Sequence, residues 1–189
     1  MSINAVPEDV QWLPHPKCSK PHALWSSPDK DATEVEVTAF VAALVRLLKP
    51  GVVVETGTYQ GHTTSAIAEA LAVNTTGRVW TFETDQARAI LAYEALRDHV
   101  DAGRVVIHNT RAVPDMLPQG IELAFLDSGM RDRDEDMRSV WPRLAPGGLV
   151  LVHDASPRRP PGKVRPPGPH AMFDFATPRG LLAFQKPWP

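Results

Sequence analysis

The sequence has 189 residues, of which 43% are hydrophobic and 22% charged, and its formal net charge is −2. This size and composition fit one globular domain with a single core. The nearly balanced charge excludes the basic excess of a nucleic-acid-binding domain. Cys18 is the only cysteine, so a disulfide within the chain is excluded. The N-terminus lacks an apolar signal core and no apolar run is as long as a membrane span, so we expect a soluble, cytoplasmic protein.

Residues 1–30 predict an irregular N-terminal arm, followed by one domain over residues 31–189. The arm carries tryptophan, proline and histidine without a clear period, Trp12 among them. Two interpretations stay open: a lid over a ligand site, or a segment that only packs on the domain. A capping box over Thr33–Glu36 then opens an amphipathic helix, which ends at Lys49–Gly51.

A short valine run stops at Glu55, and two glycines precede the next helix. A continuous β-branched run is typical of a buried parallel strand. Gly57 and Gly61 let the backbone turn tightly and approach a ligand, and the helix that begins near Thr63 has free N–H groups that favour an anionic group. The bulky Tyr59 lies between the glycines, and their spacing is not that of a nicotinamide-binding turn. We expect a cofactor site without a pyrophosphate; a plain strand-turn-helix is the alternative.

The strand predicted over 78–83 ends in a second carboxylate, Glu83, about twenty residues after the last glycine, where a βαβ unit delivers an acid to a ribose. Alternatively, Glu83 is an ordinary charge at the end of a strand, close to Asp85, which we expect to be the N-cap of the next helix. Further along, strands alternate with helical or loop segments, which predicts a parallel sheet with helices on both faces. The later elements are a helix over 86–101 and strands over 105–107, 121–127, 149–153, 171–175 and 181–185.

The stretch from Glu55 to Thr63, taken with Glu83, resembles motifs I and II of class I S-adenosylmethionine (SAM)-dependent methyltransferases, in the E-x-G-x-x-x-G-x-S/T form common among their O-methyltransferases. The resemblance extends from about residue 30 to the end of the chain. It implies an α/β Rossmann-like fold, with a mostly parallel sheet and an antiparallel C-terminal strand, and SAM as the cofactor. The implied cofactor-binding residues are Glu55, Gly57, Thr58, Tyr59, Gly61, Thr63, Glu83, Thr84 and Asp127.

In this family the acid of motif I approaches the methionine amino group, and the glycine backbone lies against the cofactor. A hydroxyl at the start of the helix holds the methionine carboxylate. By position, the resemblance gives these roles to Glu55, to Gly57 and Gly61, and to Thr63. Glu83 would bind the ribose.

Two later strands end in carboxylate or imidazole side chains, which can act as acids, bases or metal ligands. One ends in Asp127, and the other ends in His153 and Asp154 after the turn Pro146–Gly148. The pattern is similar to small-molecule O-methyltransferases of the antibiotic-tailoring and catechol types, and it implies catalytic roles for Asp127, His153 and Asp154. In many of these enzymes the two acids hold a divalent metal that binds the substrate's oxygens, which here implies Mg²⁺ on Asp127 and Asp154.

The sequence departs from that pattern after the first aspartate, where many relatives have a histidine and this chain has Met130 and Arg131. His153 is then the candidate general base, since an imidazole titrates near neutral pH. A strand-end histidine bonded to the backbone is the alternative. We interpret the acidic cluster over 132–136 as a solvated helix start, and the proline-rich, basic stretch over 156–170 as a solvated surface loop.

The leading functional hypothesis is a SAM-dependent methyltransferase that methylates a hydroxyl of a small molecule. A SAM-binding protein without catalysis, with a regulatory or partner-binding role, is one alternative. Another Rossmann-like enzyme with a nucleotide cofactor is the second. We expect a small-molecule substrate as the partner, and neither nucleic acid nor a membrane.

Overall fold

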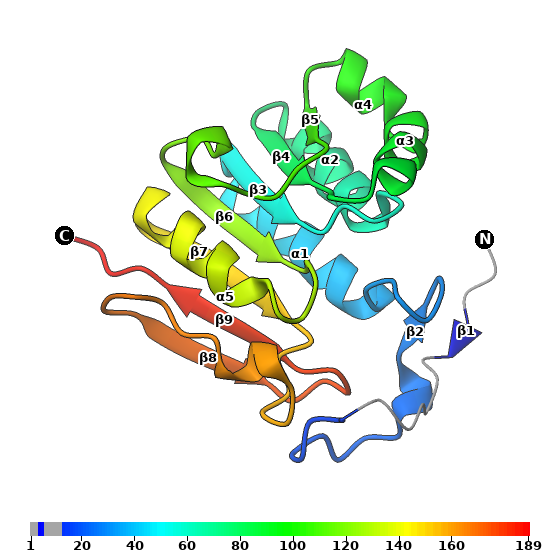
Figure 1. Ribbon diagram of the computed structural model, residues 1–189, viewed down its shortest axis with the longest axis vertical. Helices are drawn as coiled ribbons and strands as arrows, with labels where there is room; N and C mark the ends of the chain where they lie inside the picture. The colour runs from blue at the N-terminus through cyan, green and yellow to red at the C-terminus, as the bar shows by residue number, and fades with distance from the viewer. Residues whose placement is uncertain (1–3, 6–12) are drawn as a thin grey trace.

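The computed structural model describes residues 4–5 and 13–189, and this part of the chain forms an α/β domain around one seven-stranded sheet (Figure 1). The strands lie in the order β5-β4-β3-β6-β7-β9-β8. Those from β5 to β7 are parallel, whereas β9 runs antiparallel to both β7 and β8. The predicted fold class and the antiparallel last strand are confirmed. The strands span Val52–Thr56 (β3), Arg78–Phe82 (β4), Val105–His108 (β5), Ile121–Leu126 (β6), Leu144–His153 (β7), Ala171–Phe175 (β8) and Leu181–Gln185 (β9).

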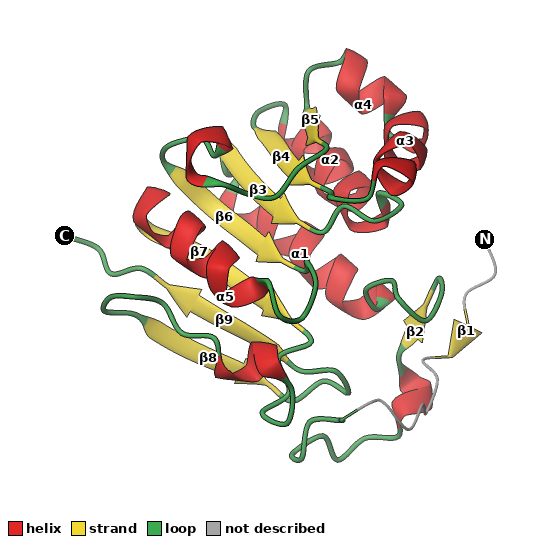
Figure 2. Cartoon of the chain, viewed as in Figure 1, coloured by secondary structure: helices red, strands yellow, loops and turns green. Residues whose placement is uncertain are grey.

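Helices cover both faces of this sheet (Figure 2). In the part of the chain that the structure describes, none of them has the length and apolar composition needed to cross a bilayer. A short antiparallel pair, β1 and β2, lies outside the main sheet. The helices span Val35–Leu48 (α1), His62–Asn74 (α2), Gln86–Ala95 (α3), Arg97–Asp101 (α4) and Arg133–Val140 (α5). The shorter elements are Asn4–Ala5 (β1), Ser26–Ser27 (β2) and the 3₁₀ turns His22–Leu24, Pro114–Met116, Trp141–Arg143 and Pro160–Lys163.

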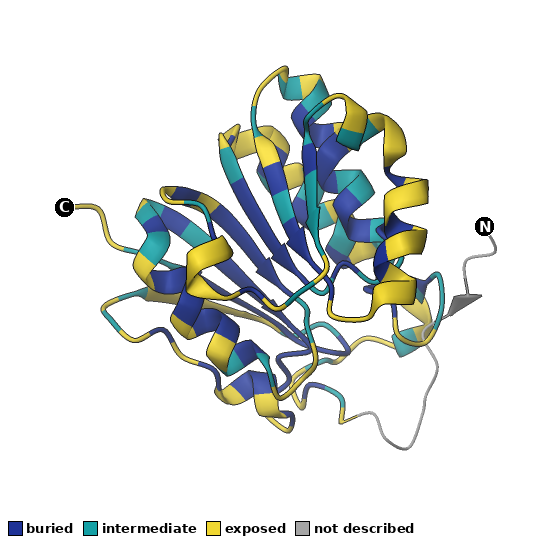
Figure 3. Ribbon diagram, turned by 45° about the horizontal axis from the view of Figure 1, so that its top comes forward, coloured by how far each residue is buried: buried dark blue, intermediate teal, exposed yellow. Residues whose placement is uncertain are grey.

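The sheet separates two hydrophobic cores, because successive side chains of a strand point to opposite faces. Val53 and Leu123 pack in a cluster with α1, α2 and α3, whereas Val54 and Ala124 pack in a cluster with α5. Figure 3 shows the inner strands buried along most of their length. Burial on both faces explains why the inner strands read as continuous apolar runs.

The strand order reverses at β3, which pairs with β4 on one side and with β6 on the other. In open α/β sheets a ligand crevice forms at the carboxyl ends of the strands beside such a reversal. In the register, Thr56 lies opposite both Phe82 and Leu126. The turn after β3, Glu83 after β4 and Asp127 after β6 therefore meet at one edge of the sheet.

The helix predicted over 86–101 is wrong as one element, since Leu96 separates α3 from α4 with φ −105° and ψ 8°. The Leu96 side chain is 1% exposed. It lies so close to Gly61 that a Cβ there would be 3.0 Å from its Cδ1. The break at Leu96 thus lets this side chain pack against the start of α2.

Two other predicted boundaries also shift. The first helix begins at Val35, with Glu34 as its N-cap residue and no side-chain capping bond. The capping-box prediction is wrong, because the Thr33 hydroxyl accepts no backbone N–H of the helix and instead donates to Asp127. The turn predicted at Pro146–Gly148 belongs to β7, whose pairing with β6 shifts register near its start.

The described part of the N-terminal arm packs along the C-terminal loops. The backbone N–H of His15 donates to Pro178 at 3.0 Å, and its ring nitrogen lies 3.1 Å from an Asp174 oxygen. Trp12 lies outside the described residues. The loop over 156–170 differs from its prediction, because Arg159 is only 4% exposed and its guanidinium donates to the carbonyl of Leu13. The division into an arm and a domain stays a prediction.

Candidate functional site

The turn after β3 has a shape that only glycine fits. Gly57 has φ +86°, and its N–H donates to Phe82 of β4 at 2.9 Å. A Cβ at this position would lie 2.6 Å from the carbonyl carbon of Asp127 and 2.8 Å from the nitrogen of Ser128. The close approach that glycine permits here is therefore to the backbone after β6, which brings two strand ends together.

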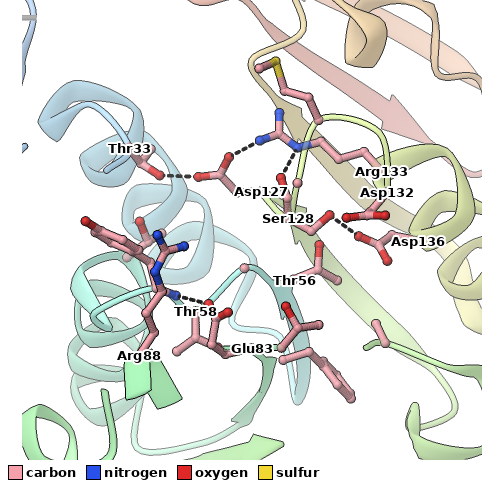
Figure 4. Close-up of a pocket in the computed structure, with 18 of the residues that line it drawn as sticks. Thr33, Thr56, Thr58, Glu83, Arg88, Asp127, Ser128, Asp132, Arg133 and Asp136 are labelled. Atoms are coloured by element: carbon pink, nitrogen blue, oxygen red, sulfur yellow. Dashed lines mark hydrogen bonds and ion pairs between the residues drawn. The ribbon is translucent and has the colours of Figure 1, made fainter. Parts of the chain in front are cut away.

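Beside this turn lies a cavity of about 580 Å³. It is bordered by the ends of β3, β4 and β6, by residues just before α1, and by the start of α5 (Figure 4). Most residues predicted to bind the cofactor line it. They are Gly57, Thr58, Tyr59, Thr63, Glu83, Thr84 and Asp127.

Glu83 lies in this cavity with its carboxylate held by the backbone. One oxygen accepts from the N–H of Tyr59 at 2.8 Å and the other from the N–H of Asp85 at 2.9 Å. Its main-chain carbonyl accepts from the side chain of Asn109 at 2.8 Å. Each carboxylate oxygen has a second lone pair, so the group retains the capacity to accept from two neighbouring hydroxyls.

Two predicted cofactor residues, Glu55 and Gly61, do not line the cavity. Glu55 is 1% exposed and accepts from the hydroxyls of Thr64 and Thr81, the latter at 2.7 Å. Burial raises its pKa from 4.5 to about 7, although both hydroxyl bonds act in the opposite direction. Gly61 instead lies at the N-terminus of α2, against Leu96.

The predicted catalytic residues Asp127, His153 and Asp154 are brought together at the ends of β6 and β7. One oxygen of Asp127 lies 2.9 Å from Nδ1 of His153 and 2.7 Å from Nη2 of Arg133. Its other oxygen accepts from the Thr33 hydroxyl at 2.5 Å. Burial alone would raise the pKa of Asp127, but the charges of His153 and Arg133 outweigh burial and hold it below its usual value.

Asp154 is surrounded by guanidinium groups. It has φ +55°, a left-handed conformation that aspartate tolerates better than most residues. Arg179 donates to both of its oxygens, at 2.6 and 2.9 Å, and Arg159 donates to one of them at 2.6 Å. Arg133 donates to the other at 3.1 Å. Despite burial, the positive charges of His153 and the arginines keep the pKa of Asp154 far below its usual value.

His153 does not fit the role of a general base. Its side chain is fully buried, and both ring nitrogens face carboxylates, Nδ1 that of Asp127 and Nε2 that of Glu34 at 2.5 Å. Burial alone would lower its pKa, but the neighbouring acids raise it to about 9. The ring is therefore an imidazolium at neutral pH, with no lone pair for a substrate proton.

The same three side chains could in principle hold a metal, since ligand atoms of Asp127, His153 and Asp154 lie within 4.8 Å of one another. The donor set does not fit a divalent ion. Every carboxylate oxygen of the two aspartates already accepts at least one bond from an arginine, histidine or threonine of the chain.

The acidic cluster over 132–136 forms the N-terminus of α5, as predicted. Asp132 and Glu135 pair with Arg111 at the surface. Asp136 differs from the solvated acid that we predicted, because it is 4% exposed and accepts from the Ser128 hydroxyl at 2.5 Å. It therefore helps to fix the loop after β6.

Sequence reasoning missed the partners of the strand-end acids. Nothing local distinguishes Arg133 from Arg131, and Arg159 belongs to a stretch whose composition is that of a solvated loop. Contacts that join distant parts of the chain leave no periodic signal. The missed residues are Thr33, Glu34, Arg133, Arg159 and Arg179.

A family model described as a methyltransferase domain matches residues 54–155, from the middle of β3 to just beyond the end of β7. No curated protein matches the chain.

Among solved structures, the chain resembles the O-methyltransferase TomG from Streptomyces achromogenes, which is involved in tomaymycin synthesis and was solved in complex with SAM. The two chains are 20% identical, with a TM-score of 0.65, and the match covers 83% of this chain and 82% of that one. An O-methyltransferase from Bacillus cereus in complex with SAH is 16% identical, with a TM-score of 0.68 and coverage of 84% of each chain. The SAH-bound methyltransferase PaMTH1 from Podospora anserina is 14% identical, with a TM-score of 0.70 and coverage of 90% and 83%.

At these identities the structural likeness shows the fold alone, whereas the family match covers more than half of the chain. The matched residues include the glycine turn, Glu83, Asp127 after β6, and His153 and Asp154 at the end of β7. The chain belongs to the methyltransferase domain family.

Proposed function

We propose that this protein is a SAM-dependent methyltransferase that transfers a methyl group to a hydroxyl of a small molecule. The observation that carries the proposal is the position of Glu83, which reaches the same cavity as the turn at Gly57 while two backbone N–H groups fix its carboxylate. A carboxylate with remaining lone pairs at this strand end suits the two hydroxyls of a ribose. The cavity volume of about 580 Å³ is in the range of small-molecule sites.

Bound SAM would supply a methyl group on a sulfonium, which the acceptor oxygen takes as the carbon–sulfur bond breaks and the hydroxyl proton passes to water. The residues of the chain would contribute orientation. Glu83 would fix the ribose, and the Asp127 end of the cavity is left for the acceptor. The Thr63 hydroxyl at the start of α2, which pairs with the Thr38 hydroxyl at 3.2 Å, could accept from Thr38 and donate to the methionine carboxylate. Alignment of two reactants can supply a large part of a rate enhancement.

Calorimetric titration with SAM, S-adenosylhomocysteine and NAD tests the cofactor assignment. We expect the two sulfur compounds to bind and NAD to give no heat. Glu83→Ala should weaken SAM binding by about 1 to 3 kcal/mol, roughly 5- to 150-fold, because charge-assisted bonds to the ribose are lost. Glu94→Ala, at an exposed position of α3, is the matched control. Equal SAM affinity in a folded Glu83→Ala variant would reject the ribose assignment.

A SAM-binding protein without catalysis is the second candidate. The observation that favours it is the occupation of Asp154 by three arginines, which leaves that strand-end acid no direct part in chemistry. Incubation with methyl-labelled SAM and a panel of hydroxyl-bearing small molecules separates the two candidates. Label transfer to any acceptor supports the enzyme, and SAM binding with no transfer across the panel supports the binding protein.

A further inference from the structure

One nitrogen of Arg133 bridges the two strand-end acids. Nη2 lies 2.7 Å from an oxygen of Asp127 and 3.1 Å from an oxygen of Asp154. We infer that the guanidinium of Arg133 is the built-in cation of this site and excludes a divalent metal from it. The inference concerns the cation alone, so its test does not depend on the proposed methyl transfer.

Arg133 lies at a position in its helix where a positive charge is unfavourable, so its contacts with Asp127 and Asp154 must outweigh that cost. It is the first residue of α5, where the positive end of the helix dipole disfavours a cation. Its side chain is nevertheless 3% exposed and turns back toward the sheet, where Nε donates to the carbonyl of Ser128 at 3.0 Å (Figure 4). Nη1 donates to the carbonyl of His153. Four contacts therefore fix the guanidinium between the ends of β6 and β7.

A metal and this guanidinium cannot occupy the site together. Mg²⁺ binds oxygen ligands at about 2.0 to 2.1 Å, so an ion shared by Asp127 and Asp154 would need the space that Nη2 fills. The remaining oxygens are also engaged, by Thr33 on Asp127 and by two further arginines on Asp154. Metal binding would require the chain to break several charge-assisted bonds at once.

The formal charges lead to the same conclusion. Arg133, Arg159 and Arg179 face three carboxyl groups, those of Asp127, Asp154 and Glu34, and the last of these lies 3.9 Å from Arg179. Protonated His153 lies among them, between Asp127 and Glu34, so these seven groups carry a formal net charge of +1 without any ion. A divalent cation would add two positive charges without partners to a region that is almost closed to water, which is strongly unfavourable.

Arg133 is thus a positioning residue, which holds the two strand ends at a fixed separation beneath the cavity. A neutral side chain of similar size would remove the positive charge that lies directly between Asp127 and Asp154, although Arg179 and His153 would still each bond one of the oxygens that Arg133 bridges. We therefore expect removal of the guanidinium to create a metal site that the wild-type protein lacks.

Titration of Mn²⁺, followed by the electron paramagnetic resonance signal of the free ion, tests this expectation in the full chain. The wild-type protein and Arg133→Lys should leave millimolar Mn²⁺ free, because each retains a cation between the acids. Arg133→Gln should bind one Mn²⁺ about tenfold more tightly or better, and a second change, Asp127→Asn, should abolish that binding. Arg138→Gln is the matched control, since Arg138 lies on the same helix, is 72% exposed and pairs only with Asp134 in the described contacts.

Two results would overturn the inference. One is tight binding of Mn²⁺ by the wild-type protein that Asp154→Asn removes. The other is a folded Arg133→Gln variant that binds Mn²⁺ no better than Arg138→Gln. If Arg133→Gln does not fold, the wild-type and Arg133→Lys titrations still decide, because Mn²⁺ bound at the aspartates of either protein contradicts a resident guanidinium.

Discussion

The two halves of the candidate site are built in different ways. The half that we propose binds the cofactor, at the ends of β3 and β4 and called the cofactor half below, uses backbone geometry and one carboxylate, Glu83, that two N–H groups hold. The acid half, at the ends of β6 and β7, uses side-chain charges drawn from the whole chain. Thr33 reaches Asp127 across 94 residues, and Glu34 reaches His153 across 119.

This difference bears on what each half can do. The carboxylate of Glu83 faces an open cavity with capacity to accept further hydrogen bonds, which suits ligand binding. The carboxylate of Asp154 is saturated by arginines, which suits a fixed support. A strand-end acid is thus not a catalytic or metal-binding group by position alone, since its partners decide its role.

We expect the largest loss of stability from a substitution at Gly57, where the two halves of the site meet. Gly57→Ala would place a Cβ against the backbone of Asp127 and Ser128. We expect a loss of about 5 kcal/mol or more in the free energy of unfolding, enough to prevent folding of a domain of ordinary stability. Urea unfolding monitored by circular dichroism measures it.

Gly120→Ala separates the steric effect from the backbone effect. Gly120 also has a positive φ, +68°, but a Cβ there would meet nothing within 4 Å. This control should lose only about 1 to 2 kcal/mol, the cost of a left-handed alanine. Equal losses in the two variants would mean that the contact between the β3 turn and β6 does not hold the halves together.

The same division explains how much the sequence predicted. The fold, the glycine turn and the approach of Glu83 to one ligand edge follow from strand periodicity and short spacings, and the structure has all of them. The partners of Asp127 and Asp154 could not be predicted in this way, because a buried arginine such as Arg133 and an exposed one such as Arg138 look alike in sequence. Only the tertiary structure decides which arginine finds a carboxylate.

The second prediction concerns the stability of the acid half alone. Asp154→Asn should lower the free energy of unfolding by about 3 to 5 kcal/mol, because it leaves buried guanidinium groups without a counter-charge. Asp134→Asn, which breaks the half-exposed pair with Arg138, should cost less than about 0.5 kcal/mol. Thermal and urea unfolding of both variants give the comparison. A loss in Asp154→Asn as small as in its control would show that the arginines do not depend on that charge.

A pH-dependent effect tests the buried acid beneath the cofactor half. Burial raises the pKa of Glu55 from 4.5 to about 7, so the folded state holds this proton more tightly than the unfolded state. Stability from this group is complete below pH 4.5 and is lost as the pH rises through about 7, by about 3 kcal/mol in all. Glu55→Gln removes the titration.

The measurement is the difference in unfolding free energy between Glu55→Gln and the wild type at several pH values. This difference should move in favour of the variant by about 3 kcal/mol between pH 4.5 and pH 8. Glu94→Gln, at an exposed position, should give a curve that stays parallel to the wild type. Parallel curves for Glu55→Gln as well would contradict the buried, proton-retaining state.

A crystal structure of the protein with S-adenosylhomocysteine, grown in millimolar Mn²⁺ and examined by anomalous diffraction, tests the whole account most directly. We expect the ribose hydroxyls to lie on Glu83 and Arg133 to bridge Asp127 and Asp154, with no manganese peak between these acids. A ribose bound away from Glu83, or a manganese ion on the two aspartates with Arg133 displaced, would contradict it.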